Sequence, residues 1–172
     1  MNAKVLVAYA TRAGSTLEVA QSIGQIFCEH GVLVDILPVK EIKSLDGYQA
    51  VIVGSAIRMG AWLPEAVKFV ESHQAALNSI PKAYFLVSLF LREDTPEMRK
   101  TVEGYLGPVR QILEPDSLAI FPGKMDYSKL SWVERQAAKF VKAPEGDYRD
   151  WEAVRGWAQK LASNGFLSKS VS

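Results

Sequence analysis

Five short apolar runs alternate with longer amphipathic segments along the 172 residues of the chain. The runs have the length and β-branched content of buried strands, and we expect strands at Lys4–Tyr9, Val32–Val39, Ala50–Ser55, Lys82–Leu89 and Ser117–Phe121. The segments between them repeat apolar residues at helical spacing, which predicts helices at Thr16–His30, Leu63–Leu77, Thr95–Leu113 and Trp151–Leu161.

Strands that alternate with helices predict a parallel sheet, because a parallel pair of strands needs a crossover connection. Right-handed crossovers then lead to a three-layer α/β/α sandwich with helices on both faces of the sheet. Sheets of this kind bind ligands beyond the carboxyl ends of their strands. We therefore expect the functional residues in the segments that directly follow the strands.

Composition narrows the possible partners. The chain carries 20 Lys and Arg against 19 Asp and Glu, a net charge of +1, which argues against a nucleic-acid binder that works by bulk charge.

One cysteine, Cys28, and two histidines argue against a disulfide within the chain and against a metal site, and we expect Cys28 to be a buried small residue. No apolar run approaches the roughly 20 residues of a membrane helix, and no secretory pattern opens the chain. We therefore expect a cytoplasmic protein that is either soluble or peripherally attached to the inner face of a membrane.

The loop after the first strand has a composition that suits a phosphate. Its sequence is Ala10-Thr11-Arg12-Ala13-Gly14-Ser15-Thr16. The helix that follows offers unpaired N–H groups and a partial positive charge, the hydroxyl groups add donors, and Gly14 permits a tight turn. The loop lacks both the P-loop and the dinucleotide-binding glycine patterns. The alternative is that Ser15 or Thr16 only caps the helix.

The stretch Thr11–Thr16 resembles the T-x-T-G-x-T phosphate loop of the flavodoxin family. The departure at Arg12-Ala13 is similar to the S-T-R-D-G-x-T loop of the menaquinone-dependent protoporphyrinogen IX dehydrogenase subgroup. Three further stretches resemble that subgroup. They are Gly54–Gly60 after the third strand, Val87–Arg92 after the fourth, and Tyr148–Glu152 at the start of the last helix.

This resemblance implies one flavodoxin-like domain over residues 1–172, with sheet order 2-1-3-4-5 and an inserted segment at about 126–148. It also implies an FMN cofactor, electrons drawn from a reduced tetrapyrrole, and a quinone as acceptor. The segments after the first, third and fourth strands would then bind FMN. Their candidate residues are Thr11, Arg12, Ala13, Gly14, Ser15, Thr16, Ser55, Ala56, Ile57, Arg58, Met59, Gly60, Trp62, Ser88, Leu89, Phe90, Leu91 and Arg92.

Three arginines follow three different strands. Arg12, Arg58 and Arg92 would place positive charge beside a phosphate, a reduced flavin or a substrate carboxylate. Each also has the alternative of a surface ion pair. Trp62 and Phe90 are candidates to cover the flavin, with core packing as the alternative for both. We assign no acid or base, because a bound flavin carries the redox chemistry itself.

The segment Asp126–Tyr148 is too long for a minimal connection between a helix and a strand. It predicts a short helix at Trp132–Val141, with one side formed by Trp132, Val133, Gln136, Ala137 and Phe140. Between Tyr127 and Lys142 four basic residues stand against one acidic residue. Such a helix suits a membrane surface, a lid over an apolar substrate, or a packed connection.

Two other functions fit the same fold. A soluble flavodoxin that carries electrons is one, although carriers of this kind are usually strongly acidic around the flavin and this chain is nearly neutral. A flavodoxin-like interaction domain without FMN is the other.

Overall fold

A computed structural model of the chain describes residues 2–140, 142 and 145–168. Its centre is a parallel sheet in the order β2-β1-β3-β5-β6, which is the expected order 2-1-3-4-5 when the two-residue strands are left out. The sheet strands are β1 (Lys4–Ala10), β2 (Leu33–Pro38), β3 (Ala50–Arg58), β5 (Lys82–Ser88) and β6 (Ser117–Pro122). The expected fold class is confirmed.

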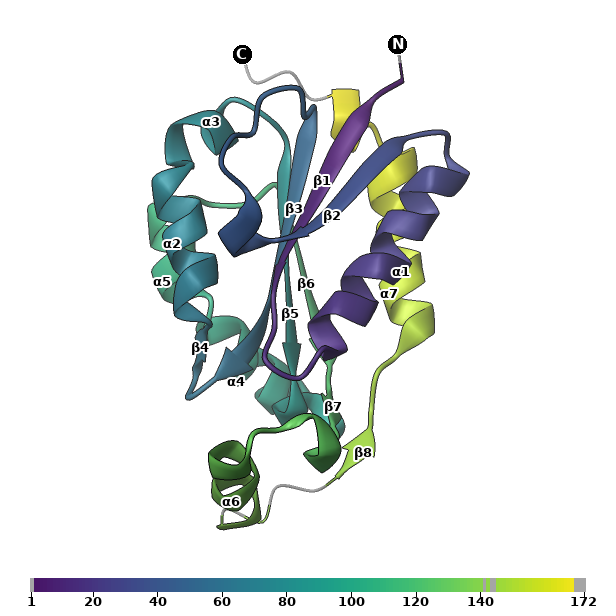
Figure 1. The fold of residues 1–172 in the computed structure, drawn as a ribbon. Helices are drawn as coiled ribbons and strands as arrows, with labels where there is room; N and C mark the ends of the chain where they lie inside the picture. The colour runs from purple at the N-terminus through teal and green to yellow at the C-terminus, as the bar shows by residue number, and fades with distance from the viewer. Residues whose placement is uncertain (1, 141, 143–144, 169–172) are drawn as a thin grey trace.

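Helices cover both faces of the sheet (Figure 1). One face carries α1 (Ser15–Glu29) and α7 (Trp151–Ser163). The other carries α2 (Pro64–Ser72), α3 (Gln74–Asn78), α4 (Pro96–Gly104) and α5 (Gly107–Ile112). Four 3-10 turns lie between them: η1 (Val39–Glu41), η2 (Leu89–Arg92), η3 (Tyr127–Lys129) and η4 (Phe166–Ser168).

Alternate residues of each central strand enter two separate cores. Val5 and Val7 of β1 pack beneath α1 and α7, whereas Leu6 and Ala8 pack on the side of α2. Every residue of β5 is buried, Lys82 included. A sheet covered on both faces requires apolar residues at consecutive positions, which is why the strands appear in the sequence as unbroken apolar runs.

Two helices that the apolar spacing predicts as continuous are each broken. His73 separates α2 from α3, and its ring Nδ1 lies 3.0 Å from the carbonyl oxygen of Phe69. Tyr105 and Leu106 separate α4 from α5. The second break coincides with Gly104 and with Gly107-Pro108, where glycine favours helix weakly and proline lacks an N–H donor.

The stretch that the sequence predicts as a loop after β3 is a β-hairpin. β3 continues to Arg58 and pairs antiparallel with β4 (Ala61–Trp62), with Ile57 opposite Trp62 and Arg58 opposite Ala61. Met59 and Gly60 form the two-residue turn at positive φ, 54° and 72°. Positive φ at both central positions matches the twist of a tight hairpin, and Gly60 is the residue that takes it without strain.

Cys28 is exposed, so the expectation that it is buried is wrong. The buried residues of α1 end at Phe27, and Cys28 lies in the last turn of the helix, beyond the residues that pack on the sheet.

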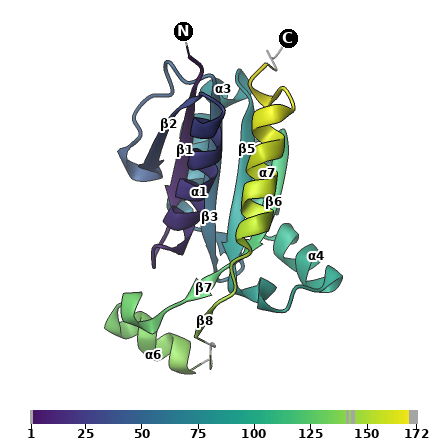
Figure 2. The same cartoon turned by 90° about the vertical axis from the view of Figure 1, so that its right-hand side faces the viewer.

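The segment after β6 extends below the carboxyl ends of the sheet strands (Figures 1 and 2). Its base is a short antiparallel pair of β7 (Lys124–Met125) with β8 (Gly146–Asp147). Between them lie η3 and α6 (Trp132–Phe140), so the expected helix is confirmed up to Phe140, and Val141 lies outside the described residues. The described helices include none that is long and apolar enough to cross a membrane.

Candidate functional site

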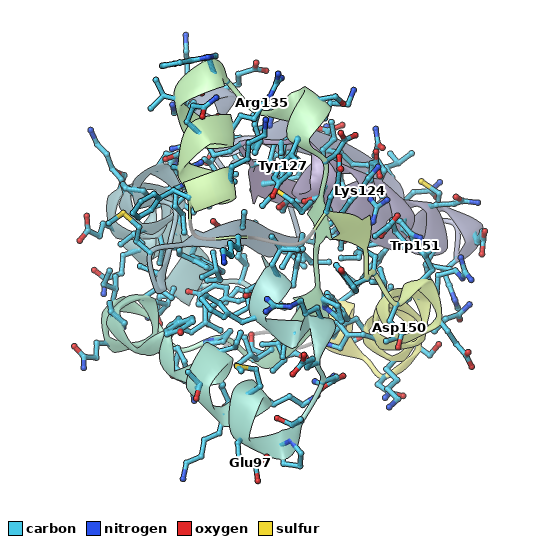
Figure 3. All side chains as sticks on the ribbon, turned by 90° about the horizontal axis from the view of Figure 1, so that it is seen from below. Glu97, Lys124, Tyr127, Arg135, Asp150 and Trp151 are labelled. Atoms are coloured by element: carbon cyan, nitrogen blue, oxygen red, sulfur yellow. The ribbon has the colours of Figure 1, made fainter. Side chains whose placement is uncertain are left out.

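The segments after β1, β3 and β5 meet at the carboxyl edge of the sheet. The strand register places Ala10 beside Ser55 and Ala56 beside Val87, so the loops that follow start next to one another. Figure 3 views the molecule from this edge, with α6 and η3 above the centre of the picture. The structure therefore brings the three predicted segments together where a parallel sheet binds its ligands.

The loop between β1 and α1 has the form of an anion-binding turn. Gly14 is the N-cap of α1 with φ 86°, and its N–H donates to Thr11 Oγ1 at 3.0 Å. The first bond inside the helix runs from Glu18 N to Gly14 O, at 3.3 Å. The amides of Ser15, Thr16 and Leu17 therefore precede the helical ladder, as the first amides of a helix do. No side chain caps α1, so the capping role considered for Ser15 or Thr16 does not occur.

Thr16 has a buried hydroxyl group without a partner. Its side chain is 0% exposed, and Oγ1 lacks a hydrogen-bond partner within the described part of the chain. Burying an unpaired hydroxyl costs about 1–3 kcal/mol. A ligand acceptor at the N-terminus of α1 would remove that cost, and a phosphate is the group that such a terminus favours.

Arg12 forms a two-pronged ion pair with Glu65 in the first turn of α2. Arg12 Nη2 lies 3.0 Å from Glu65 Oε2, and Nη1 contacts Oε1. The hydrogen bond from Arg12 lowers the pKa of Glu65 to about 2. The pair joins the β1–α1 loop to α2. Its two charges cancel, so Arg12 would attract a phosphate less strongly than an unpaired arginine would.

Arg58 is paired as well, with Glu134 of α6, at 2.6 Å between Nη2 and Oε1. Glu134 also accepts the N–H of Ser131 at 3.0 Å, while the N–H of Glu134 donates to Ser131 Oγ at 3.3 Å. This reciprocal arrangement is a capping box for α6. The bonds from Ser131 and Arg58 lower the pKa of Glu134 to about 2. Sequence reasoning missed this pair because its members are 76 positions apart.

Besides Thr16 and Ser88, three further predicted ligand-binding residues are buried: Ser55, Trp62 and Leu91. Ser55 is buried, and its hydroxyl accepts the N–H of Leu63 at 3.0 Å and donates to Ala56 O at 2.8 Å. Trp62 is 3% exposed, with its ring 5.2 Å from that of Tyr84, and its Nε1 is a second buried donor without a described partner. Leu91 is buried in the same core. These three side chains have the placement of residues that support the loops from within.

The remainder of the β3 segment becomes progressively more exposed. Ala56 and Ile57 are half-buried, and Met59 at the hairpin tip is 98% exposed. Gly60 faces the ring of Tyr105, which would lie 3.4 Å from an added Cβ. The hairpin therefore projects from the edge of the sheet.

The segment after β5 forms η2 and presents two exposed side chains. Ser88 Oγ accepts the N–H of Phe90 at 3.2 Å and caps the turn, and Leu89 is half-buried. Phe90 is exposed, with its ring edge-on to Tyr105 at 6.1 Å between centroids. Arg92 is exposed and has no ion-pair partner among the described residues, in contrast to Arg12 and Arg58.

Arg149 is a structural residue that the sequence pattern did not identify. Its side chain is 5% exposed, and it binds Asp147 through Nε at 2.8 Å and Nη2 at 2.7 Å. It also contacts Glu18 in the first turn of α1, and its guanidinium lies 4.6 Å from the ring centre of Trp151. Arg149 thereby ties the start of α1 to β8 and to the start of α7, where Trp151 is labelled in Figure 3.

One hollow of the described structure lies at the opposite edge of the sheet. It is an open depression of about 610 Å³ between α3 and α5, lined by residues that include Gln74, Lys82 and Glu114. It contains none of the predicted site residues. Among the described residues, no three His, Cys, Asp or Glu side chains gather as a metal would require.

Comparison with known proteins agrees with this geometry. The family model described as "Flavodoxin domain" matches residues 6–152, which include all three segments of the candidate site. The chain belongs to the flavodoxin domain family. The resemblance inferred from Thr11–Thr16 and the later stretches is thereby confirmed at the level of the family.

Curated relatives of this flavodoxin-domain chain include two enzymes called protoporphyrinogen IX dehydrogenase [quinone]. One, from Escherichia coli strain K12, is 28% identical over 173 residues, covering 92% of this chain and 94% of the relative. Another, from Leishmania major, is 26% identical over 175 residues, covering 93% of this chain and 75% of the relative.

Solved flavodoxins share the fold at low identity. A short-chain flavodoxin associated with a bacterial microcompartment has a TM-score of 0.62 and 14% identity, covering 94% of this chain and 98% of its own. A Streptococcus pneumoniae flavodoxin has a TM-score of 0.60 and 15% identity, covering 94% and 99%. These similarities support the fold only.

Proposed function

We propose that this chain binds FMN at the carboxyl edge of its sheet and acts as a dehydrogenase on a reduced tetrapyrrole of the protoporphyrinogen class, with a quinone as electron acceptor. The observation that carries the cofactor assignment is the buried, unpartnered hydroxyl of Thr16 at the uncapped N-terminus of α1. The substrate and acceptor follow the names of relatives that align over more than nine-tenths of this chain.

The residues present fit a flavin phosphate. The amides of Ser15, Thr16 and Leu17 and the hydroxyl groups of Ser15 and Thr16 would donate to it, while Thr11 Oγ1 holds the turn in place. Gly14 leaves open space at the turn, since nothing lies within 4 Å of the position a Cβ would take. FMN, once bound, supplies the redox centre that no side chain provides.

The other two segments would border the flavin ring. The β3–β4 hairpin contributes the backbone of Ala56, Ile57 and Arg58, and η2 contributes the backbone of Leu89 and the ring of Phe90. Ser55, Trp62 and Leu91 support these segments from the core. In this proposal these three residues hold the segments in place and do not contact the flavin themselves.

The arginines at this edge have unequal roles in the proposal. Arg12 and Arg58 are compensated by Glu65 and Glu134, so their main effect is to hold the loops in position. Arg92 has no ion-pair partner among the described residues and is the guanidinium available to a carboxylate of the substrate. The near-neutral chain also lacks the excess of acidic residues by which carrier flavodoxins attract basic partners.

The test is a stepwise reduction under anaerobic conditions. Protein reconstituted with FMN is mixed with protoporphyrinogen, and the visible flavin absorbance is followed before and after menaquinone is added. We expect bleaching by the tetrapyrrole and recovery with the quinone. A flavin that is retained but stays oxidised with protoporphyrinogen would point to an electron carrier, and a chain that never retains FMN would point to an interaction domain.

A further inference from the structure

The helix α6 packs against the protein with its polar side and turns its apolar side outward. Its large apolar residues are exposed: Trp132 by 73%, Val133 by 69% and Phe140 by 89%. Its least exposed residues are Glu134, Arg135 and Ala138. This orientation is the reverse of that of an ordinary surface helix, which buries its apolar stripe.

The outward residues form one continuous stripe. At 3.6 residues per turn, positions 132, 133, 136, 137 and 140 fall within about 140° of the helix circumference, and Ala138 lies nearly opposite the middle of that arc. All five residues in the stripe are exposed. A packed connection would bury them and a lid would turn them toward the site, so the orientation favours the remaining alternative, a helix that faces a membrane surface.

Polar contacts fix α6 in this orientation. Arg135 Nε donates to Tyr127 O at 3.0 Å, and Figure 3 shows Arg135 directed from α6 toward Tyr127. On the same buried side Glu134 binds Arg58 of the β3–β4 hairpin. Both contacts would break if the helix rotated its apolar stripe toward the protein, so the stripe stays at the surface.

Exposed apolar side chains concentrate at this edge of the molecule. The large exposed apolar residues in the described chain are Leu33, Met59, Phe90, Trp132, Val133 and Phe140. All but Leu33 follow the carboxyl ends of the strands. Met59 stands at the tip of the hairpin that Arg58 joins to α6.

The charge around this stripe is positive. Five basic residues against two acidic ones give residues 124–142 a net charge of +3, whereas the whole chain carries +1. Lys129, Lys139 and Lys142 are exposed, and one acidic residue, Glu134, is paired with Arg58. Exposed aromatic residues flanked by lysines are the combination that binds the interface of an anionic lipid bilayer.

We propose that α6, together with the adjoining hairpin tip, docks this protein on an anionic membrane surface. Trp132, Val133 and Phe140 would enter the boundary between headgroups and acyl chains, and Lys129 and Lys139 would contact lipid phosphates. The proposal depends on the exposed stripe and not on the flavin. If the proposed function also holds, docking would bring the carboxyl edge to the layer in which an apolar quinone dissolves.

The test is co-sedimentation of the purified chain with vesicles of phosphatidylcholine, alone or mixed with phosphatidylglycerol, at low and high salt. We expect binding to the anionic vesicles that weakens with salt. The variant W132Q/F140Q should reduce the partition coefficient about tenfold or more, because each aromatic side chain contributes burial energy on insertion. The variant K129E/K139E should reduce binding to anionic vesicles and remove its dependence on salt.

Two matched controls come from the opposite end of the fold. L33Q removes an exposed apolar residue at the start of β2, and K160E reverses a lysine at the end of α7; both should bind vesicles as the parent does. Unchanged circular dichroism in every variant confirms that the fold is intact. The proposal is overturned if the parent fails to bind anionic vesicles. It is also overturned if sedimentation shows a dimer that W132Q/F140Q converts to a monomer, because the stripe would then pair with a second copy.

Discussion

Arg58 and Glu134 lie 2.6 Å apart although 76 positions separate them in the chain. Arg58 ends β3, and Glu134 is in the first turn of α6. Because Glu134 also forms the capping box with Ser131, one carboxylate holds both the start of α6 and its attachment to the hairpin. The segment after β6 that contains α6 is thereby attached to the β3–β4 hairpin of the candidate site.

Replacing Glu134 by Gln should loosen that attachment with little effect on global stability. An exposed ion pair contributes at most about 1 kcal/mol, so we expect the melting temperature to fall by only a few degrees. Amide hydrogen exchange should become faster in both α6 and the β3–β4 hairpin. The control S131A removes the capping hydroxyl but keeps the pair, so it should affect α6 alone. Unchanged exchange in the hairpin of E134Q would show that the pair does not couple the two segments.

Acid should destabilise the protein through Glu65 and Glu134, whose pKa values are held at about 2 from an ordinary 4.5. A carboxylate with a lowered pKa in the folded state stabilises fully above the unfolded value, and that stabilisation is lost as the pH falls toward the folded value. The free energy of unfolding should therefore decrease between about pH 4.5 and 2.

Urea denaturation at pH 6 and pH 3 tests this for Glu65, the less exposed of the two carboxylates. In E65Q the difference in unfolding free energy between the two pH values should shrink by about 1 kcal/mol. This value is smaller than the pKa shift alone would give, because the Arg12 side chain is partly exposed and solvent screens the pair. An identical pH dependence in E65Q and the parent would contradict the assignment.

Replacing Gly14 by Ala should reduce FMN binding more than it reduces stability. Gly14 has φ 86° and open space around the Cβ position, so the cost to the fold is the strain of a positive φ, about 1 kcal/mol. Relief of that strain would rotate the turn and misdirect the amides at the start of α1.

The substitution G47A is a matched control for G14A. Gly47 has φ 85° with equally open surroundings, and it lies before β3 at the opposite edge of the sheet. G47A should lose similar stability and keep its affinity for FMN, which fluorescence titration with FMN measures. Equal FMN affinity in G14A and G47A would show that the geometry of the β1–α1 turn does not matter for binding.

Replacing Gly54 by any larger residue should destabilise the protein, because the ring of Phe85 packs directly against this position. Gly54 lies in the middle of β3, and a Cβ added there would lie 1.9 Å from Cζ of Phe85 in β5. We expect G54A to destabilise the protein by about 3 kcal/mol, the upper part of the range for overpacked cores. The double variant G54A/F85L should recover part of that loss in denaturant titrations, and a G54A protein as stable as the parent would contradict the packing.

The alternation of strands with helices and the three site segments could be predicted because they depend on local patterns: buried apolar runs, helix starts and a hydroxyl-rich loop. The sheet order was predicted from the resemblance to the flavodoxin family. The partners of the arginines could not be predicted, since Arg12–Glu65, Arg58–Glu134 and Arg149–Glu18 join residues far apart in the chain. The hairpin was missed for a related reason. Its turn places Met59 at positive φ, a conformation that is uncommon for residues other than glycine and that the sequence therefore does not indicate. The outward stripe of α6 was visible as a pattern, but its direction depends on the tertiary contacts of Arg135 and Glu134.

The central claim is that the N-terminus of α1 holds a flavin phosphate, and T16V tests it most directly. Valine keeps the shape of Thr16 and removes the unpartnered hydroxyl, so the free protein should be as stable as the parent or slightly more so. Titration of both apoproteins with FMN should show an affinity about 10-fold or more lower in T16V, the loss expected for a hydrogen bond to a charged group. Equal FMN affinity in the two proteins would contradict the account.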